Sequence, residues 1–226
     1  MKLLDRSVHL ASAASLNYLL YAPDDYSANS PNLPLMVFLH GGGGCGDNIE
    51  LVKRHGLPKE LEAGLQLPFI VLAPQNPHIK QFWDEVALIA LINHIVEEHN
   101  IDRTRIYLTG ISRGGYGAWR LAINNPRLFA ALAVICGASA PYVYAGYIAH
   151  MPIQVYHGAK DAIIPLHVSE QMVEALRRRG CDVRFTIFPE GAHAIWDEVY
   201  KDKQLYNWFL RYNLGCQGDE DNYQVI

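Results

Sequence analysis

Short apolar runs alternate with amphipathic segments along almost the whole chain, and this alternation is the feature that most restricts the fold. Strands that alternate with helices favour a mostly parallel sheet with helices on both faces. The apolar runs predict strands at about 16–21, 35–39, 69–73, 105–109, 130–136, 152–157 and 183–188. The amphipathic segments predict helices near 50–63, 84–99, 114–124, 167–179 and 197–212. Half of the 226 residues are apolar, so we expect one α/β domain over 1–214, followed by a polar, acidic tail over 215–226.

A serine lies on the predicted turn between the strand at 105–109 and the helix that follows it. Ser112 is the centre of Gly110-Ile111-Ser112-Arg113-Gly114. A Gly-X-Ser-X-Gly turn strains its central residue and exposes the hydroxyl, and it needs small outer residues because the backbone closes on itself. The pentapeptide alone also fits an ordinary loop serine. The interpretation of Ser112 as a nucleophile therefore depends on partners elsewhere in the chain.

An acid and a histidine follow this serine in the chain, each on a turn after a predicted strand. Asp161 comes after Ile153–Tyr156, and His193 comes after Val183–Phe188. An imidazole, with an ordinary pKa of about 6.5, suits proton transfer near neutral pH, and an acid fixes its tautomer. Taken alone, Asp161 fits a turn residue and His193 is one of ten histidines. The chain order Ser, Asp, His predicts a catalytic triad of Ser112, Asp161 and His193.

Four consecutive glycines, Gly41–Gly44, end the predicted strand at 35–39. Glycines let backbone N–H groups approach a ligand, and each amide aimed at a developing oxyanion is worth about 3–4 kcal/mol. We predict that the amides of Gly42 and Arg113 form this oxyanion hole. The alternative is a phosphate-binding loop, but its lysine and Ser/Thr do not follow Gly44, where the chain reads Cys45-Gly46-Asp47-Asn48.

Taken together, these motifs resemble the α/β-hydrolase superfamily, and in particular the esterase and predicted-peptidase group related to feruloyl esterases and polyhydroxybutyrate depolymerases. The resemblance implies the α/β-hydrolase fold and esterase activity without a cofactor. Two positions depart from the group, which often has an apolar residue at Arg113 and an acid at Cys45. The resemblance covers nearly the whole chain, through 17–23, 33–41, 73–75 with Trp83, 101–107, 114–119 and 157–161.

Five further residues are candidates for substrate contacts. Gln75 and Trp83 resemble group positions near the mouth of the active site, although a tryptophan at a helix start often serves packing. Trp196 follows His193 closely. Tyr142 and Tyr144 lie in the short connection before the strand at 152–157, where larger lids are commonly inserted in this fold. The short connection predicts a minimal lid and an open cleft, and its tyrosines would either line the cleft or pack on the core.

The charge and the cysteines of the chain indicate which partners it lacks, namely nucleic acid and metal ions. A net charge of −4 without a basic block argues against a nucleic-acid surface. The four scattered cysteines have no zinc-site spacing, so we expect neither a metal nor another cofactor. Charged residues at Met1–Arg6 precede any apolar stretch, and no run approaches a membrane span. We expect a cytoplasmic protein, or a secreted one if a leader has been removed; the sequence leaves the oligomeric state open.

The reaction predicted from these residues is hydrolysis of a small-molecule carboxylic ester through an acyl-enzyme. The triad indicates acyl transfer, whereas the preference for esters follows from the resemblance. Cleavage of a peptide bond or a thioester uses the same residues and is the main alternative. A ligand-binding protein without turnover on a hydrolase scaffold is a third reading, which the presence of all three triad candidates disfavours.

Overall fold

The computed structural model describes residues 1–9, 15–138 and 142–216, and eight strands within them form one sheet. The spatial order is β1-β2-β4-β3-β5-β6-β7-β8. Strands β3 to β8 run parallel, and β2 is antiparallel to both of its neighbours. The predicted mostly parallel α/β sheet is confirmed. The strands are β1 (Lys2–His9), β2 (Ser15–Ala22), β3 (Leu33–Leu39), β4 (Ile70–Pro74), β5 (Ile101–Ile111), β6 (Ala131–Ile135), β7 (Ile153–Gly158) and β8 (Val183–Phe188).

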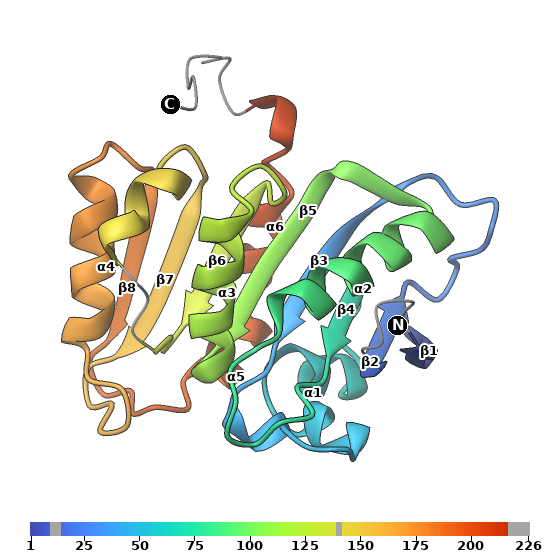
Figure 1. The fold of residues 1–226 in the computed structure, drawn as a ribbon, viewed down its shortest axis with the longest axis horizontal. Helices are drawn as coiled ribbons and strands as arrows, with labels where there is room; N and C mark the ends of the chain where they lie inside the picture. Colours follow the sequence, from blue (N-terminus) through green and yellow to red (C-terminus); the bar gives the residue numbers. More distant parts are fainter. Residues whose placement is uncertain (10–14, 139–141, 217–226) are drawn as a thin grey trace.

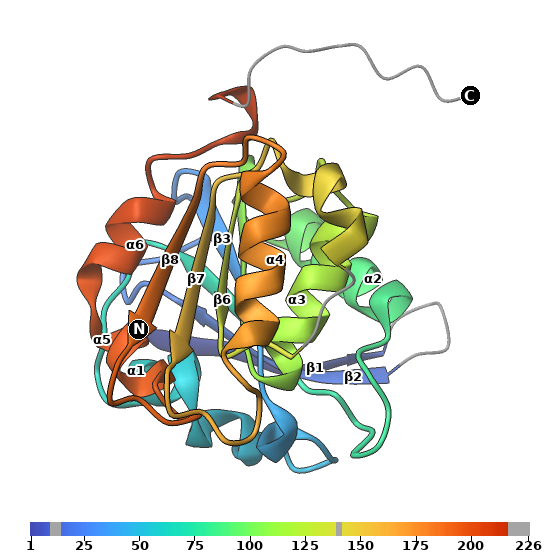
Figure 2. The ribbon, with the colours of Figure 1, turned by 90° about the vertical axis from the view of Figure 1, so that its left-hand side faces the viewer.

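Helices cover both faces of the sheet (Figure 1). The view in Figure 2 separates the two layers, with α2, α3 and α4 on one face and α1, α5 and α6 on the other. The α-helices are α1 (Gly56–Glu62), α2 (Glu85–Glu98), α3 (Arg113–Asn124), α4 (His167–Arg177), α5 (Trp196–Lys201) and α6 (Lys203–Phe209). The 3₁₀ helices are η1 (Gly42–Gly44), η2 (Ile49–Arg54), η3 (Tyr142–Ile148) and η4 (Leu214–Cys216).

The central strands are apolar along their length because each of their faces is covered. In β3, Val37 and Leu39 pack into the layer that holds α2, α3 and α4. Met36 and Phe38 pack into the opposite layer, with α1, α5 and α6. All four side chains are completely buried. This alternation along one strand produces two cores, one on each side of the sheet.

The structure differs from the sequence prediction at one strand and two helices. Strand β1 was not predicted, because its charged residues hide the strand pattern at the edge of the sheet. The helix predicted at 50–63 is divided into η2 and α1 by Gly56, whose φ is +66°. The helix predicted at 197–212 is divided into α5 and α6 by Asp202, which is extended and caps α6 by accepting from the amide of Gln204.

Three segments lie outside these residues: 10–14, 139–141 and 217–226, the last of which holds most of the predicted acidic tail. Among the helices of the described ranges, none combines the length and the apolar character needed to cross a membrane.

Candidate active site

The predicted triad residues lie in loops that follow β5, β7 and β8. Parallel strands end at the same edge of a sheet, and sites in this class of fold form at that edge. Ser112 follows β5, Asp161 follows β7 and His193 follows β8. The glycine segment Gly41–Gly44 follows β3 and reaches the same edge. The fold therefore brings together four segments that are far apart in the chain.

Ser112 occupies a strained turn between β5 and α3. Its φ of +52° and ψ of −118° lie outside the conformations that most non-glycine residues adopt. A Cβ at Gly114 would lie 1.9 Å from the carbonyl oxygen of Leu39, and one at Gly110 would lie 2.4 Å from that of Gly114. Both outer positions of the motif therefore require glycine, and the turn holds the serine side chain away from the sheet.

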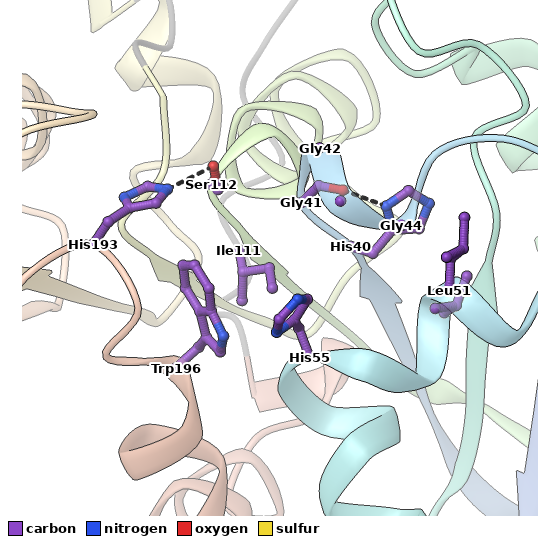
Figure 3. A pocket seen from close by; sticks show the side chains of 12 residues that line it. His40, Gly41, Gly42, Gly44, Leu51, His55, Ile111, Ser112, His193 and Trp196 are labelled. Carbon is purple, nitrogen blue, oxygen red and sulfur yellow. Dashed lines mark hydrogen bonds between the residues drawn. The ribbon is translucent and has the colours of Figure 1, made fainter.

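His193 connects Ser112 to Asp161 through hydrogen bonds from both ring nitrogens. The Nδ1 group donates to Asp161 Oδ2 at 2.7 Å. With Nδ1 protonated, Nε2 accepts from the hydroxyl of Ser112, and the two atoms are 2.9 Å apart (Figure 3). A neutral imidazole in this tautomer is arranged to take the serine proton.

Asp161 is held in the ionised form. The other carboxylate oxygen, Oδ1, accepts from the amides of Ile163 at 2.9 Å and Ile164 at 2.8 Å. Burial by itself raises the pKa of Asp161, but the hydrogen bonds from His193 and the two amides outweigh it and leave the pKa below its ordinary value. The carboxylate can thus stabilise a positive charge on His193 at neutral pH.

The amides of Gly42 and Arg113 both belong to the first residue of a helix. Gly42 begins η1 and Arg113 begins α3. The first N–H groups of a helix have no acceptor within that helix, which leaves them available to a ligand. The two segments are in close contact, because a Cβ at Gly41 would lie 3.3 Å from Cβ of Ser112.

The buried side chain of His40 holds the backbone of this glycine segment through hydrogen bonds. Its Nδ1 group donates to the carbonyl oxygen of Gly41 at 2.6 Å, and Nε2 accepts from the amide of Asn76 at 3.0 Å. Burial lowers the pKa of His40 to about 4, opposed by the hydrogen bond to Gly41 and aided by the nearby Arg113 charge. The ring is neutral near pH 7, and both of its nitrogens are occupied.

A cavity of about 200 Å³ opens beside the serine. Figure 3 shows Ser112, His193 and the glycine segment along one side, with Trp196, Ile111 and His55 below them. The lining residues are His40, Gly41, Gly42, Gly43, Gly44, Leu51, Val52, His55, Ile111, Ser112, His193 and Trp196. Ser112, His193 and the glycine segment therefore line one space that a small molecule can enter.

In a comparison with protein families, the model of the dienelactone hydrolase family matches residues 76–207, which is more than half of the chain. The chain belongs to the dienelactone hydrolase family. As a member of this family it is an α/β-hydrolase of the serine esterase class.

Relatives of this dienelactone hydrolase family member include two fungal esterases. It is 23% identical to feruloyl esterase B of Thermothelomyces thermophilus, over 92% of this chain and 85% of the relative. It is 30% identical to a probable feruloyl esterase C of Aspergillus flavus, over 88% of this chain and 75% of the relative. Both alignments extend over most of the two proteins compared.

Two solved structures with the same fold belong to proteins that are longer than this chain. A thermostable esterase superposes with a TM-score of 0.79 at 28% identity, over 93% of this chain. The acylaminoacyl peptidase of Pyrococcus horikoshii superposes with a TM-score of 0.72 at 19% identity, over 99% of this chain. The chain spans 63% of the first protein and 43% of the second.

Two of the predicted substrate residues in this family member support the glycine segment and do not line the cavity. Gln75 is 1% exposed, and its amide donates to the carbonyl oxygens of Gly44 at 2.9 Å and Asn48 at 2.8 Å. Trp83 is buried and packs on His40, with ring centroids 4.7 Å apart. Both side chains hold the loop in this structure, and their contact with a substrate stays a prediction.

Tyr142 and Tyr144 also do not line the cavity. They lie in η3, which is on the α4 side of the sheet and leads into the amino end of β7, away from the edge that carries Ser112 (Figure 1). Both side chains are about half exposed. Their role as aromatic walls of a wider cleft stays a prediction, since the cavity itself is formed without them. Of the five candidates, Trp196 alone lines the cavity, and its ring meets that of His193 edge to face at 5.2 Å.

Sequence reasoning missed His55 and the apolar lining residues of the cavity. His55 precedes the glycine that divides η2 from α1, and the prediction of one continuous helix hid this turn. A His-Gly pair inside a predicted helix was the available signal.

Within the described ranges, three potential metal ligands meet at one place: Cys136, His157 and Asp161. His157 and Asp161 already have hydrogen-bond partners within the protein, and the thiol of Cys136 is protonated. Burial raises the pKa of the Cys136 thiol to about 12. His157 contacts Ser169 Oγ through Nδ1 at 2.7 Å and the carbonyl oxygen of Ile164 through Nε2 at 2.8 Å. With Asp161 engaged as described above, we interpret this cluster as a support of the acid and not as a metal site.

Proposed function

We propose that this protein hydrolyses small carboxylic esters, with Ser112 as nucleophile, His193 as base and Asp161 as the acid that orients it. The observation that carries the proposal is the pair of hydrogen bonds through which His193 joins Ser112 Oγ at 2.9 Å to Asp161 Oδ2 at 2.7 Å, beside an open cavity. Family membership and the likeness to feruloyl esterases support an ester as substrate.

The reaction takes two steps. His193 removes the proton of Ser112 as the oxygen attacks the ester carbonyl, and Asp161 stabilises the imidazolium that forms. The carbonyl oxygen becomes an anion that accepts from the amides of Gly42 and Arg113. His193 then gives its proton to the departing alcohol, which leaves an acyl group on Ser112. In the second step His193 takes a proton from water as its oxygen attacks the acyl group. The bond to Ser112 then breaks, His193 returns the proton to the serine oxygen, and the acid is released.

Peptide or thioester cleavage is the alternative on the same triad. A peptide bond needs protonation of a poor amine leaving group, whereas an alcohol leaves more readily. The likeness to the acylaminoacyl peptidase concerns the fold only, so it does not by itself favour this alternative.

The test is release of p-nitrophenol from its acetate and butyrate esters by the purified protein and by Ser112→Ala. Ser27→Ala, at an exposed position in the loop after β2, is the matched control. We expect activity in the wild type and in the control, and loss of it in Ser112→Ala. An acyl-CoA and an N-acetylated dipeptide at equal concentration measure the thioester and amide alternatives. Folded wild type that turns over none of these substrates contradicts the proposal and favours non-catalytic binding.

We also propose a cytoplasmic location and no nucleic-acid partner. The net charge of −4 supports the second statement, because a nucleic-acid surface needs a cluster of cations. Cell fractionation tests the first, and a salt-dependent gel-shift assay with duplex DNA and single-stranded RNA tests the second.

A further inference from the structure

Three histidines line the cavity beside Ser112, and they differ in what their ring nitrogens do. Those of His40 both take part in hydrogen bonds that hold the glycine segment. Those of His193 both take part in the triad. His55 makes no hydrogen bond to any part of the chain that the structure describes, although it lines the same cavity. Neither the fold nor the proposed mechanism uses its polar atoms.

The backbone holds His55 in place. It is the extended residue before α1, with φ of −145° and ψ of 154°. Gly56 follows with a φ of +66°, which favours glycine, and a Cβ there would lie 2.8 Å from Cζ of the buried Phe38. This turn is therefore anchored on the core, and it directs the side chain of His55 towards the cavity (Figure 3).

The surroundings of His55 are apolar or aromatic. Its ring meets that of Trp196 edge to face, with centroids 6.2 Å apart. Leu51, Val52 and Ile111 complete the apolar lining of the cavity. His55 itself is exposed, so it lies at the rim, where the cavity meets solvent. A substrate group that fills this space contacts mainly carbon, with one imidazole at its outer end.

We propose that His55 is a specificity residue, which binds a hydroxyl or carbonyl oxygen on the substrate group that occupies this cavity. A neutral imidazole offers one donor and one acceptor, so it can pair with either kind of oxygen. The inference rests on the proposed ester hydrolysis and names its substrate class: esters with an apolar part that fits beside Trp196 and ends in one hydrogen-bonding oxygen. That part is either the acid or the alcohol of the ester.

Solvent at the rim limits the size of the effect. Water hydrates the oxygen of the free substrate and the imidazole of the free enzyme. The hydrogen bond in the complex replaces these hydrogen bonds to water, so its net contribution to the binding free energy is small. We therefore expect His55 to improve the use of the hydroxylated substrate over its parent by about fivefold.

The experiment compares substrates in matched pairs. For the acid side, the pair is ethyl 3-phenylpropanoate and ethyl 3-(4-hydroxyphenyl)propanoate. For the alcohol side, it is 2-phenylethyl acetate and 2-(4-hydroxyphenyl)ethyl acetate. In each pair kcat/KM for the hydroxylated ester is divided by kcat/KM for its parent, and this ratio is compared among wild type, His55→Phe, His55→Gln and His150→Phe. The intrinsic reactivity of each ester is the same for every variant, so it cancels when the ratios of two variants are compared.

We expect the ratio in one pair to fall about fivefold in His55→Phe and to recover in part in His55→Gln, which keeps a donor and an acceptor. His150→Phe, an exposed histidine at the opposite edge of the sheet, should keep the wild-type ratio. The pair that responds shows whether the acid or the alcohol enters the cavity. Ratios unchanged by His55→Phe in both pairs, with Ser112-dependent turnover of the parent esters, overturn the role of His55 alone. Absence of Ser112-dependent turnover of every ester contradicts the proposed function itself.

Discussion

Nε2 of His157 lies 3.3 Å from Oδ2 of Asp161, and neither side chain is exposed to solvent. The same carboxylate oxygen accepts from His193 at 2.7 Å. Since Ser169 contacts the other nitrogen of His157, that ring has a fixed orientation against the acid. His157 therefore limits the movement of Asp161, although it does not reach the cavity.

Replacing His157 by Phe should lower kcat by between about tenfold and a hundredfold, because a small displacement of Asp161 misaligns His193. KM should change much less, since His157 is remote from the substrate. His157→Gln can still donate to the carbonyl oxygen of Ile164, which Nε2 of His157 contacts at 2.8 Å, and should recover part of kcat. A fall in thermal stability with unchanged kcat in both variants would assign His157 a purely structural role. Assays well below the melting temperature separate the two effects.

Arg113→Met tests whether the oxyanion contact comes from the backbone. The side chain of Arg113 donates to the carbonyl oxygen of Ile79 and lies over the glycine segment. The backbone amide at position 113 is unchanged when this side chain is replaced. We expect kcat to fall far less than the roughly hundredfold that loss of an oxyanion donor costs. A fall of a hundredfold or more, in a folded variant with p-nitrophenyl acetate, would mean that the guanidinium itself takes part.

Gly114→Ala should be strongly destabilising, because the added Cβ would meet the carbonyl oxygen of Leu39 at 1.9 Å. We expect the free energy of unfolding to fall by roughly 3 kcal/mol or more, together with loss of activity. Gly64→Ala is the control: its φ is +102°, but nothing lies within 4 Å of an added Cβ, so about 1 kcal/mol of backbone strain is expected. Urea unfolding measures both variants. Equal losses would show that the turn around Ser112 can widen.

Stability should depend on pH through His40, whose pKa falls from 6.5 to about 4 on folding. The unfolded chain then binds this proton more tightly than the native one, so the free energy of unfolding decreases as pH falls from about 6.5 to 4. The contribution of His40 over this range is roughly 3 kcal/mol. Urea unfolding between pH 4 and 7 should show a shallower dependence in His40→Gln than in wild type. Parallel curves would contradict the burial of a neutral ring.

The sequence predicts those parts of the fold and site that depend on local pattern. The apolar runs at 35–39 and 105–109 are buried on both faces, so their periodicity identifies β3 and β5. Ser112, Asp161 and His193 come together because each follows a parallel strand. Strand β1 escaped prediction because an edge strand tolerates charge and lacks a continuous apolar run.

Side-chain direction in loops depends on contacts between distant segments, which a single sequence does not display. Gln75 turns towards Gly44 and Asn48, more than twenty-five residues away in the chain. His55 faces the cavity because a glycine against Phe38 interrupts the helix predicted there. Tyr142 and Tyr144 likewise lie outside the lining of the cavity, which the length of their connection does not reveal.

The pairing of the strands also sets the distances within the site. Ile111 of β5 pairs with Ile135 of β6, Ile135 pairs with Tyr156 of β7, and Gly158 of β7 pairs with Phe188 of β8. A shift of one residue in any of these pairings displaces a strand by about 3.3 Å, which is more than a hydrogen bond spans. The register of the strands therefore determines the distance of 2.9 Å between Nε2 of His193 and Oγ of Ser112. Insertions at the opposite edge should be tolerated, whereas an insertion within β6 or β7 would separate the base from its nucleophile without touching either.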